Sequence, residues 1–193
     1  MIKAIIFDCF GVLTTDLWKE FVESQPIEVD RAKLRQLNSQ LDAGFLSLTD
    51  FTRGVKELTG TYPDRIEDIL STSQATKNVK LLGIIRNLKE SGFKVGMLSN
   101  VSSNWIREVF LSEEEQALFD DMVFSYEVHL TKPDQRIFRL SCERLGIEPA
   151  ESILVDDSKA NCEAAEDLDI KTIHYQNFSR FTEELSKLTG GKI

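Results

Sequence analysis

The fold is decided by a stretch near the start of the chain, Ala4-Ile5-Ile6-Phe7-Asp8, in which four apolar residues end in a carboxylate. A run of this length without polar alternation is typical of a strand buried on both faces of a parallel sheet. Further short apolar runs follow at 95–98, 122–124, 153–155 and, more weakly, 171–175. Patterns with helical spacing lie between them, at 78–90, 133–145 and 158–168. Strands that alternate with helices predict an α/β fold, a Rossmann-like doubly wound and mostly parallel sheet.

The interval from residue 16 to residue 77 has a different character. It contains amphipathic stretches at 30–41, 49–59 and 63–70 but no convincing strand. An insertion of this length is too long for an ordinary connection between a strand and a helix. We therefore expect an α/β core made of residues 1–15 and 78–193, and a small all-helical cap made of residues 16–77.

Composition restricts the class of protein. The chain has 193 residues, of which 41% are hydrophobic and 28% charged, as expected of a globular protein. Its formal net charge of -9 disfavours nucleic-acid binding, because an acidic surface repels a phosphate backbone. No apolar run approaches the ~20 residues that cross a bilayer, and the amino-terminal stretch is too short and too soon charged for a secretion signal. These features predict a cytoplasmic protein without a membrane partner.

Polar side chains stand where the predicted strands end. Asp8 ends the first strand, and Ser99-Asn100 ends the second. Thr131-Lys132-Pro133 precedes a helix, and Asp156-Asp157-Ser158 follows the run at 153–155. Because ligands bind beyond the carboxyl ends of the strands in an open α/β sheet, these four segments are expected to converge.

Each of these groups has a use in phosphoryl transfer. A carboxylate such as Asp8 can attack phosphorus and form an aspartyl-phosphate. Together with the Asp156-Asp157 pair it can hold Mg²⁺, which screens the charge between carboxylate and phosphate. Lys132 can stabilise the transferring oxygens, and Ser99 can donate a hydrogen bond to phosphate. We also expect a helix directly after Ser99, whose first amides would favour an anion.

Taken singly, each segment has an ordinary explanation. An aspartate at a strand end is commonly a turn or cap residue, Ser-Asn is common turn chemistry, and Asp-Asp-Ser before a helix is a capping sequence. The order of the segments, each after the proper element, is what favours a catalytic site.

The same segments resemble the motifs of the haloacid dehalogenase-like superfamily. Phe7-Asp8-Cys9-Phe10-Gly11-Val12-Leu13 is similar to its first motif, and Leu98-Ser99-Asn100 to its second. Leu130-Thr131-Lys132-Pro133-Asp134 is similar to the third, and Val155-Asp156-Asp157-Ser158 with Asn161 to the fourth. The branch that it resembles contains sugar-1-phosphate phosphatases and the amino-terminal domain of epoxide hydrolase.

The resemblance implies a role for each residue. Asp8 would be the nucleophile and a Mg²⁺ ligand, and the backbone carbonyl of Phe10 would be a second ligand. Asp157, with Asp156 directly or through water, would complete the metal site. Ser99, Asn100 and Lys132 would bind the phosphate of a small phosphorylated metabolite, and Lys132 would also serve catalysis.

Phe10 departs from the pattern of the phosphatases, which usually carry a second aspartate there to protonate the leaving group. Phenylalanine cannot transfer a proton, so a contribution of ~10²–10⁴ in rate is absent or comes from elsewhere. We expect a phosphatase for substrates with a good leaving group, such as a sugar-1-phosphate. Two alternatives are a degenerate binding protein and a 2-haloacid dehalogenase. The intact Asp156-Asp157 pair disfavours the dehalogenase, because carboxylates near Asp8 without a cation would repel one another.

The predicted cap should select the substrate. The apolar residues that we consider for its lining are Leu17, Trp18, Phe21, Phe45 and Leu46. The three cysteines, Cys9, Cys142 and Cys162, match no zinc pattern and are expected to be small packing residues.

Overall fold

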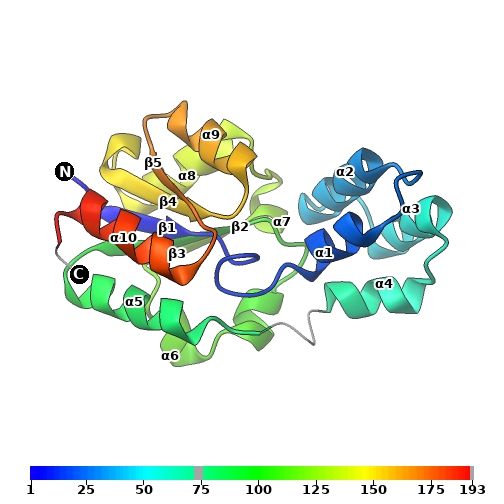
Figure 1. Ribbon diagram of the computed structural model, residues 1–193, viewed down its shortest axis with the longest axis horizontal. Coiled ribbons are helices and arrows are strands. Elements are labelled where there is room, and N and C mark those ends of the chain that lie inside the picture. Colours follow the sequence, from blue (N-terminus) through cyan, green and yellow to red (C-terminus); the bar gives the residue numbers. More distant parts are fainter. Residues whose placement is uncertain (72–75, 192–193) are drawn as a thin grey trace.

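The computed structural model of the chain describes residues 1–71 and 76–191. Five parallel strands form one sheet in the order β3-β2-β1-β4-β5 (Figure 1). The strands are β1 (Ala4–Phe7), β2 (Lys94–Ser99), β3 (Asp121–Phe124), β4 (Ser152–Asp156) and β5 (Lys171–His174). Each matches one of the apolar runs, so the predicted Rossmann-like α/β fold is confirmed, with a sheet that is wholly parallel.

Burial on both faces explains why these strands carry continuous apolar runs. All four residues of β1 are buried, and alternate residues enter opposite hydrophobic clusters, Ile5 and Phe7 on one face and Ala4 and Ile6 on the other. The first face is covered by α5 (Val79–Glu90) and α10 (Phe178–Thr189). The second is covered by α8 (Gln135–Leu145) and α9 (Lys159–Glu166). Helices on both faces therefore exclude water from every central strand.

The strand order places a topological switch point between β1 and β4. From β1 the chain builds outward through β2 and β3 on one side, and β4 and β5 lie on the other side. In the register of the β1–β4 pair, Phe7 stands opposite Val155. The next residues, Asp8 and Asp156, are therefore adjacent at the edge where ligands bind in such sheets.

Four helices follow β1 and lie beside the sheet as a separate group (Figure 1). They are α1 (Leu17–Ser24), α2 (Arg31–Asp42), α3 (Leu48–Thr59) and α4 (Pro63–Leu70). We call them the α1–α4 group. Its buried apolar side chains form a hydrophobic cluster of their own, made of Val22, Leu34, Leu41, Phe51, Val55 and Ile66. No strand occurs in the described part of residues 16–77, as expected.

Local signals fixed most helix ends, with two corrections. The α3 helix begins at Leu48, one residue before the expected stretch 49–59, and is capped by Ser47, which accepts from the amide of Asp50. The α8 helix begins at Gln135, two residues later than the expected start at 133, and the carboxylate of Asp134 caps it. The sequence patterns predicted neither α1 nor α10. They also did not predict the short elements, which are a π-helix (Ile106–Phe110), α6 (Glu113–Gln116), α7 (Ser125–Val128) and a 3-10 helix (Pro149–Glu151).

The expected helix directly after Ser99 is also wrong. The first helical residues after β2 are those of the π-helix, which begins at Ile106. The intervening backbone is held by the core instead, since the amide of Val101 donates to the hydroxyl of Ser125 at 2.9 Å. That amide is therefore not free to bind an anion. Among the described residues, no helix has the length and apolar character that crossing a bilayer requires.

Candidate active site

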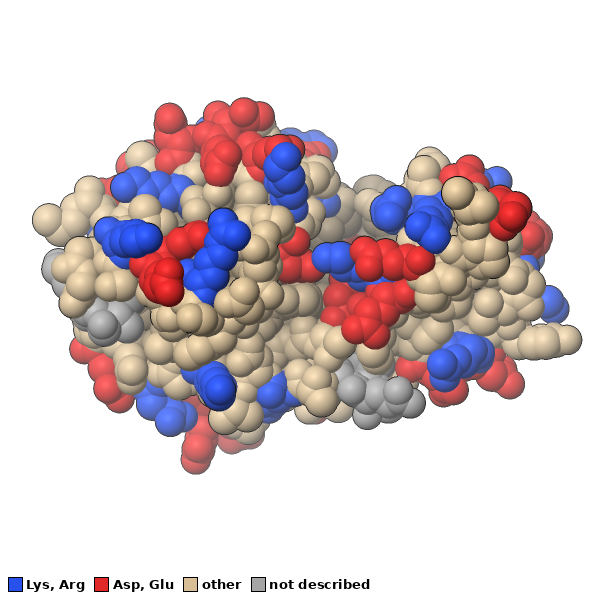
Figure 2. All heavy atoms as spheres, in the orientation of Figure 1, with Lys and Arg blue, Asp and Glu red and all other residues tan. Residues whose placement is uncertain are grey.

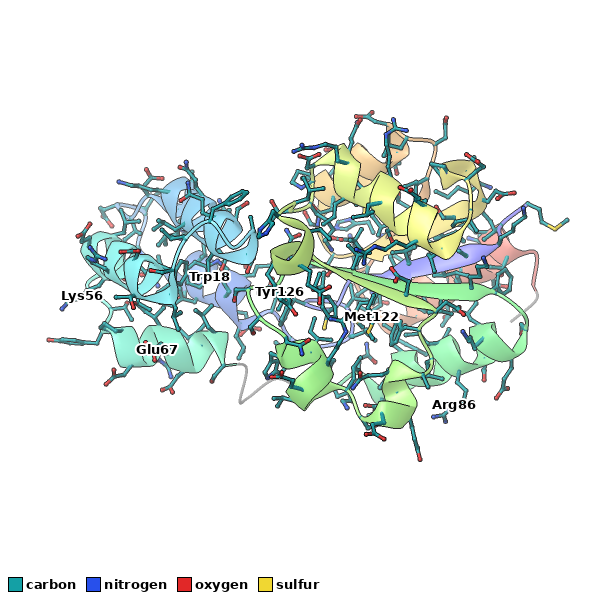
Figure 3. All side chains as sticks on the ribbon, turned by 180° about the vertical axis from the view of Figure 1, so that it is seen from behind. Trp18, Lys56, Glu67, Arg86, Met122 and Tyr126 are labelled. Atoms are coloured by element: carbon teal, nitrogen blue, oxygen red, sulfur yellow. The ribbon has the colours of Figure 1, made fainter. Side chains whose placement is uncertain are left out.

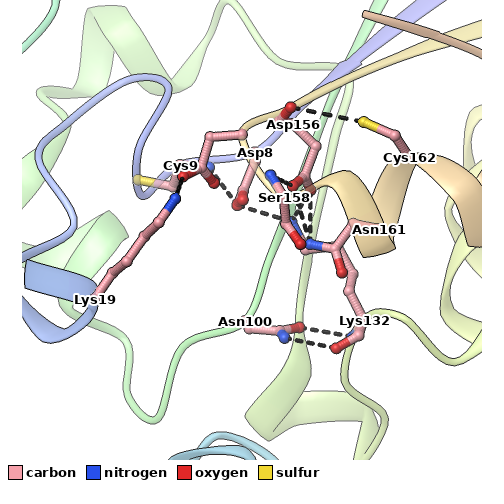
Figure 4. A network of polar contacts seen from close by, with 10 residues as sticks. Asp8, Cys9, Lys19, Asn100, Lys132, Asp156, Ser158, Asn161 and Cys162 are labelled. Atoms are coloured by element: carbon pink, nitrogen blue, oxygen red, sulfur yellow. Dashed lines mark hydrogen bonds and ion pairs between the residues drawn. The ribbon is translucent and has the colours of Figure 1, made fainter. Parts of the chain in front are cut away.

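Asp8 follows β1 and lies at the centre of a buried polar network (Figure 4). Its Oδ1 accepts hydrogen bonds from the amide of Cys9 at 2.7 Å and from Nζ of Lys132 at 2.8 Å. No described residue donates to its Oδ2. One carboxylate oxygen is therefore fixed by the protein while the other is left for a ligand.

Lys132 lies between two carboxylates. Its Nζ is 2.8 Å from Asp8 Oδ1 and 2.7 Å from Asp156 Oδ2, and the lysine side chain is 1% exposed. Burial alone would lower the pKa of Lys132, but the ion pairs with Asp156 and Asp8 raise it above its ordinary value. The lysine is thus held as a cation at the carboxyl edge of the sheet. Conversely, burial raises the pKa of Asp8 well above its usual range, and Lys132 opposes that rise.

The two aspartates of the fourth segment differ in their surroundings. Asp156 is fully buried, and both of its oxygens are taken by protein donors, namely Lys132, the amide of Ser158 and the side-chain amide of Asn161. Asp157 is only partly buried and lines a cavity. Its Oδ2 pairs with Nζ of Lys19, from α1, at 2.6 Å. Asp156 therefore positions Lys132 and the loop, while Asp157 faces the site.

The donor set fits a small divalent cation. Asp8, Asp156 and Asp157 each bring one carboxylate oxygen within 4.8 Å of the others. The loop after β1 reaches this cluster closely, because a Cβ on Gly11 would lie 2.4 Å from Cγ of Asp157. Gly11 has φ of +77°, which only glycine adopts readily. The carbonyl of Phe10, in the same loop, accepts no hydrogen bond from a described residue, so an oxygen ligand is available beside the carboxylates.

Ser99 and Asn100 occupy the places that the sequence predicted, with different surroundings. The hydroxyl of Ser99 is buried and has no hydrogen-bond partner among the described residues. An unpartnered buried hydroxyl is costly, but Ser99 is fully buried and is not among the residues that line the cavity. The side chain of Asn100 forms a pair of hydrogen bonds with the backbone of Lys132, at 2.8 and 3.0 Å. Asn100 therefore holds the lysine loop, in addition to lining the cavity.

A cavity of about 650 Å³ lies between the sheet and the α1–α4 group. It contains Asp8, Asp157 and Lys132 at one end and residues of α1, α2 and α4 along its walls. The space-filling view shows the molecule hollowed between its two lobes, with acidic and basic side chains at the margin (Figure 2). Seen from behind, Trp18 lies within the α1–α4 group near its junction with the core, and Lys56 and Glu67 point away (Figure 3).

The candidate lining residues of the helical insertion are only partly confirmed. Leu17 and Trp18 line the cavity. Phe21 and Leu46 pack against the hydrophobic cluster of the α1–α4 group. Phe45 is 71% exposed and stacks on His129 at a centroid distance of 5.8 Å, outside the cavity wall. The three cysteines are buried and free, in keeping with packing roles.

Two charged groups of the site escaped the sequence analysis. The sequence analysis assigned no role to Lys19, yet it pairs with Asp157, and both residues line the cavity. Asp42 was not considered, yet it is buried in the cavity wall. A signal for Asp42 did exist, because Arg35, Asn38, Ser39 and Asp42 recur at the spacing of one helix face, distinct from the face that carries the leucines of the same helix.

Comparison with known proteins places these residues in a family. A sequence profile described as haloacid dehalogenase-like hydrolase matches residues 2–169. The D-ribitol-5-phosphate phosphatase of Bacteroides thetaiotaomicron is 26% identical over 207 residues, which cover 96% of this chain and 98% of that protein. A sesquiterpene phosphatase of Aspergillus oryzae is 26% identical over 194 residues, which cover 97% of each.

Solved structures agree with the sequence comparisons. A haloacid dehalogenase family enzyme of Bacteroides thetaiotaomicron, solved as a magnesium complex, superposes with a TM-score of 0.70 at 25% identity, covering 94% of this chain and 98% of that chain. Two longer relatives match over 63% of this chain, which spans 11% of the length of one and 22% of the other.

Proposed function

The chain belongs to the haloacid dehalogenase-like hydrolase family, and we propose that it is a Mg²⁺-dependent phosphatase that hydrolyses a small organic phosphate through an aspartyl-phosphate on Asp8. The observation that carries the proposal is the cluster of Asp8, Lys132 and Asp157 at the end of the cavity. Two phosphatases that match nearly the whole chain support it.

Asp8, the carbonyl of Phe10 and Asp157 would hold the magnesium ion, with Asp156 behind them. The ion would supply positive charge that screens the approach of a carboxylate to a phosphate group. The magnesium complex of the similar enzyme from Bacteroides thetaiotaomicron supports this assignment.

Each of the protein side chains has its own role in the reaction. One oxygen of the Asp8 carboxylate attacks phosphorus, while the amide of Cys9 and Nζ of Lys132 hold the carboxylate in place. Lys132 stabilises negative charge on the phosphate oxygens as the leaving oxygen departs. Ser99 donates its free hydroxyl to a phosphate oxygen, and Asn100 keeps Lys132 in register. Water then cleaves the aspartyl-phosphate and restores Asp8.

Phe10 limits the substrates that this site can use well. Its ring stacks on Trp105 at a centroid distance of 6.0 Å and has no proton to give to a leaving alkoxide. Anomeric or acyl phosphates need less acid assistance than alkyl phosphates, so we propose a preference for a sugar-1-phosphate or another activated phosphate. In this proposal residues 16–77 act as a cap that closes one side of the cavity and selects the alcohol.

The test is phosphate release from p-nitrophenyl phosphate, acetyl phosphate, hexose-1-phosphates and hexose-6-phosphates, with and without Mg²⁺. Asp8→Asn should abolish turnover, whereas Asp50→Asn, which changes an exposed aspartate of α3, should leave it unchanged. Mg²⁺-dependent release that favours the activated esters is the expected result. If no phosphate ester is hydrolysed but 2-chloropropionate yields chloride, the protein is a dehalogenase. If neither reaction occurs, the site binds without turnover.

A further inference from the structure

The α2 helix presents two different faces. Leu34, Leu37 and Leu41 pack into the hydrophobic cluster of the α1–α4 group. The residues of α2 that line the cavity are all polar, and they are Arg35, Asn38, Ser39 and Asp42. Their spacing of three, four and seven positions puts them in one stripe along the helix. We call this stripe the polar face of α2.

The carboxyl end of α2 is seated on the core beside the lysine loop. The hydroxyl of Ser39 lies 3.1 Å from that of Thr131, the residue before Lys132. The hydroxyl of Ser125 donates to the carbonyl of Asp42 at 2.7 Å. The polar face therefore starts near the phosphate-binding residues and extends outward for roughly 10 Å, from Asp42 to Arg35, at 1.5 Å per residue. A molecule whose phosphate lies at Lys132 would extend along it.

Asn38 and Asp42 form a pair with unused hydrogen-bonding capacity. Nδ2 of Asn38 donates to Oδ2 of Asp42 at 2.7 Å, and neither Oδ1 atom has a partner among the described residues. Burial, with a smaller contribution from Asp16, raises the pKa of Asp42 to about 8, and the hydrogen bond from Asn38 opposes the rise. At neutral pH the pair thus offers both donors and acceptors without a fixed negative charge.

No cation neutralises Asp42 through a hydrogen bond or ion pair among the described residues. The elements packed against α2 are α1, α3 and α7. The charged or titratable groups on these elements and next to them are Asp16, Lys19, Glu20, Glu23, Asp50, Arg53, Lys56, Glu57, Tyr126, Glu127 and His129, and α2 itself adds Arg31, Lys33 and Arg35. Lys19 pairs with Asp157, Arg53 with Asp50, and Arg107 with Glu127, and none of the described cations forms an ion pair with Asp42.

The other walls of the cavity mix apolar and polar side chains. Their apolar residues include Phe10, Leu17, Trp18, Val22, Ile69, Leu70 and Trp105, and their polar residues include Asp16, Lys19, Glu23, Ser102 and Ser103. Such a cavity suits a molecule that carries both hydroxyl and carbon-hydrogen groups, because the polar side chains can bind its hydroxyls while the apolar side chains contact its carbon skeleton. An apolar chain would leave the Oδ1 atoms of Asn38 and Asp42 without partners once water is displaced, which is costly.

We propose that Asn38 and Asp42 bind hydroxyl groups of the substrate, so that the enzyme acts on a phosphorylated sugar or polyol rather than on the phosphate of an apolar alcohol. This inference rests on the proposed phosphatase function. It separates the two well-covered relatives by chemistry, since the named substrate class of one is a polyol phosphate and that of the other is a terpenoid.

The test uses hydrolysis of p-nitrophenyl phosphate as the reporter reaction and measures competitive inhibition constants. The competitors are a hexose-1-phosphate, D-ribitol-5-phosphate, cyclohexyl phosphate and farnesyl phosphate. The hydroxylated competitors should bind at least tenfold more tightly than cyclohexyl phosphate, which has a ring of similar size without hydroxyls. Asn38→Leu should raise their inhibition constants at least tenfold. It should leave the KM of p-nitrophenyl phosphate and the inhibition constant of cyclohexyl phosphate within twofold.

Asn87→Leu is the matched control, because Asn87 is an exposed asparagine in α5, outside the cavity wall. It should change none of these constants. Equal weakening of all competitors by Asn38→Leu, or tighter binding of farnesyl phosphate than of either hydroxylated competitor, would overturn the inference and leave the phosphatase function standing. Absence of any p-nitrophenyl phosphate turnover in the wild-type protein would overturn the proposed function, and this inference with it.

Discussion

Replacing Lys132 with methionine should destabilise the fold as well as abolish activity. Methionine is close to lysine in length but leaves Asp8 and Asp156 without their shared cation. The lysine side chain is 1% exposed, and its Nζ lies 2.8 and 2.7 Å from the two carboxylates. Asp156 keeps its hydrogen bonds from Ser158 and Asn161, so the main effect is the loss of the positive charge that neutralises the two carboxylates.

The decrease in the free energy of unfolding can be bounded in two ways. Removal of one partner from a buried ion pair generally costs about 3–5 kcal/mol, because a buried charge is left uncompensated. Protonating one aspartate instead, at pH 7 with an ordinary pKa near 3.9, costs about 4 kcal/mol. Both routes give a similar value. For a chain of this size a loss of about 3–4 kcal/mol lowers Tm by roughly 10 °C.

Urea unfolding at pH 7, followed by circular dichroism, measures this loss. The matched control is Lys159→Met, since Lys159 is 78% exposed and pairs with Glu163 at 3.2 Å on the surface of α9. The control should lose less than about 0.5 kcal/mol. If Lys132→Met loses no more than the control, the claim that Lys132 holds the two carboxylates together is refuted.

Three further changes test other parts of the site. Gly11→Ala should lower the free energy of unfolding by more than about 2 kcal/mol in urea, because the new Cβ would lie 2.4 Å from Cγ of Asp157 at a φ of +77°. The control is Gly83→Ala in α5, where a Cβ would have no atom within 4 Å. It should be neutral or stabilising by up to about 1 kcal/mol. Because the pKa of Asp42 is raised to about 8, the folded state holds its proton more tightly than the unfolded state, so stability should fall as pH rises from about 4 to 8. Asp42→Asn should remove that fall and be more stable than wild type at pH 9, on the order of 2 kcal/mol, and parallel pH profiles of the two proteins would contradict this. Lys19→Met frees Asp157 from a half-exposed ion pair, so calorimetry should show Mg²⁺ binding roughly fivefold tighter, and unchanged affinity would mean that Lys19 and the ion do not share that carboxylate.

The sequence predicted the core of the fold well because a strand that is buried on both faces carries a continuous apolar run. The runs around Ile5 and Leu154 could hardly form anything but central parallel strands. The helices that were not predicted have weaker sequence signals. The α1 helix is capped by Asp16 and begins soon after the first motif. The tight turn at Gly11 lies just before it and masks the start of its helical periodicity. The position of the first helix after Ser99 depended on a long-range bond from Val101 to Ser125, which no local pattern contains.

The candidate site was predictable only on its core side. Asp8, Ser99, Lys132 and the Asp156-Asp157 pair follow strands or precede helices, so strand order alone brings them together. The sequence did not separate the two aspartates of that pair. Their difference arises from register, which turns Asp156 toward Lys132 and Asn161 and leaves Asp157 at the cavity.

The contributions of the α1–α4 group depend on how that group docks, which is a matter of tertiary packing. Ser39, Asp42 and Ala43 reach the core through bonds to Thr131, Ser125 and His129, and the last of these joins Nδ1 of the histidine to a carbonyl at 2.9 Å. These contacts fix the end of α2, whereas Arg35 and Asn38, farther along the polar face, form no hydrogen bond to the core among the described residues. Substitutions along that face can therefore change which alcohol is bound without disturbing the carboxylates and lysine that act on phosphorus. In the proposed function, such a division allows one catalytic core to serve different phosphates, with Phe10 restricting the leaving group and the polar face of α2 selecting the alcohol.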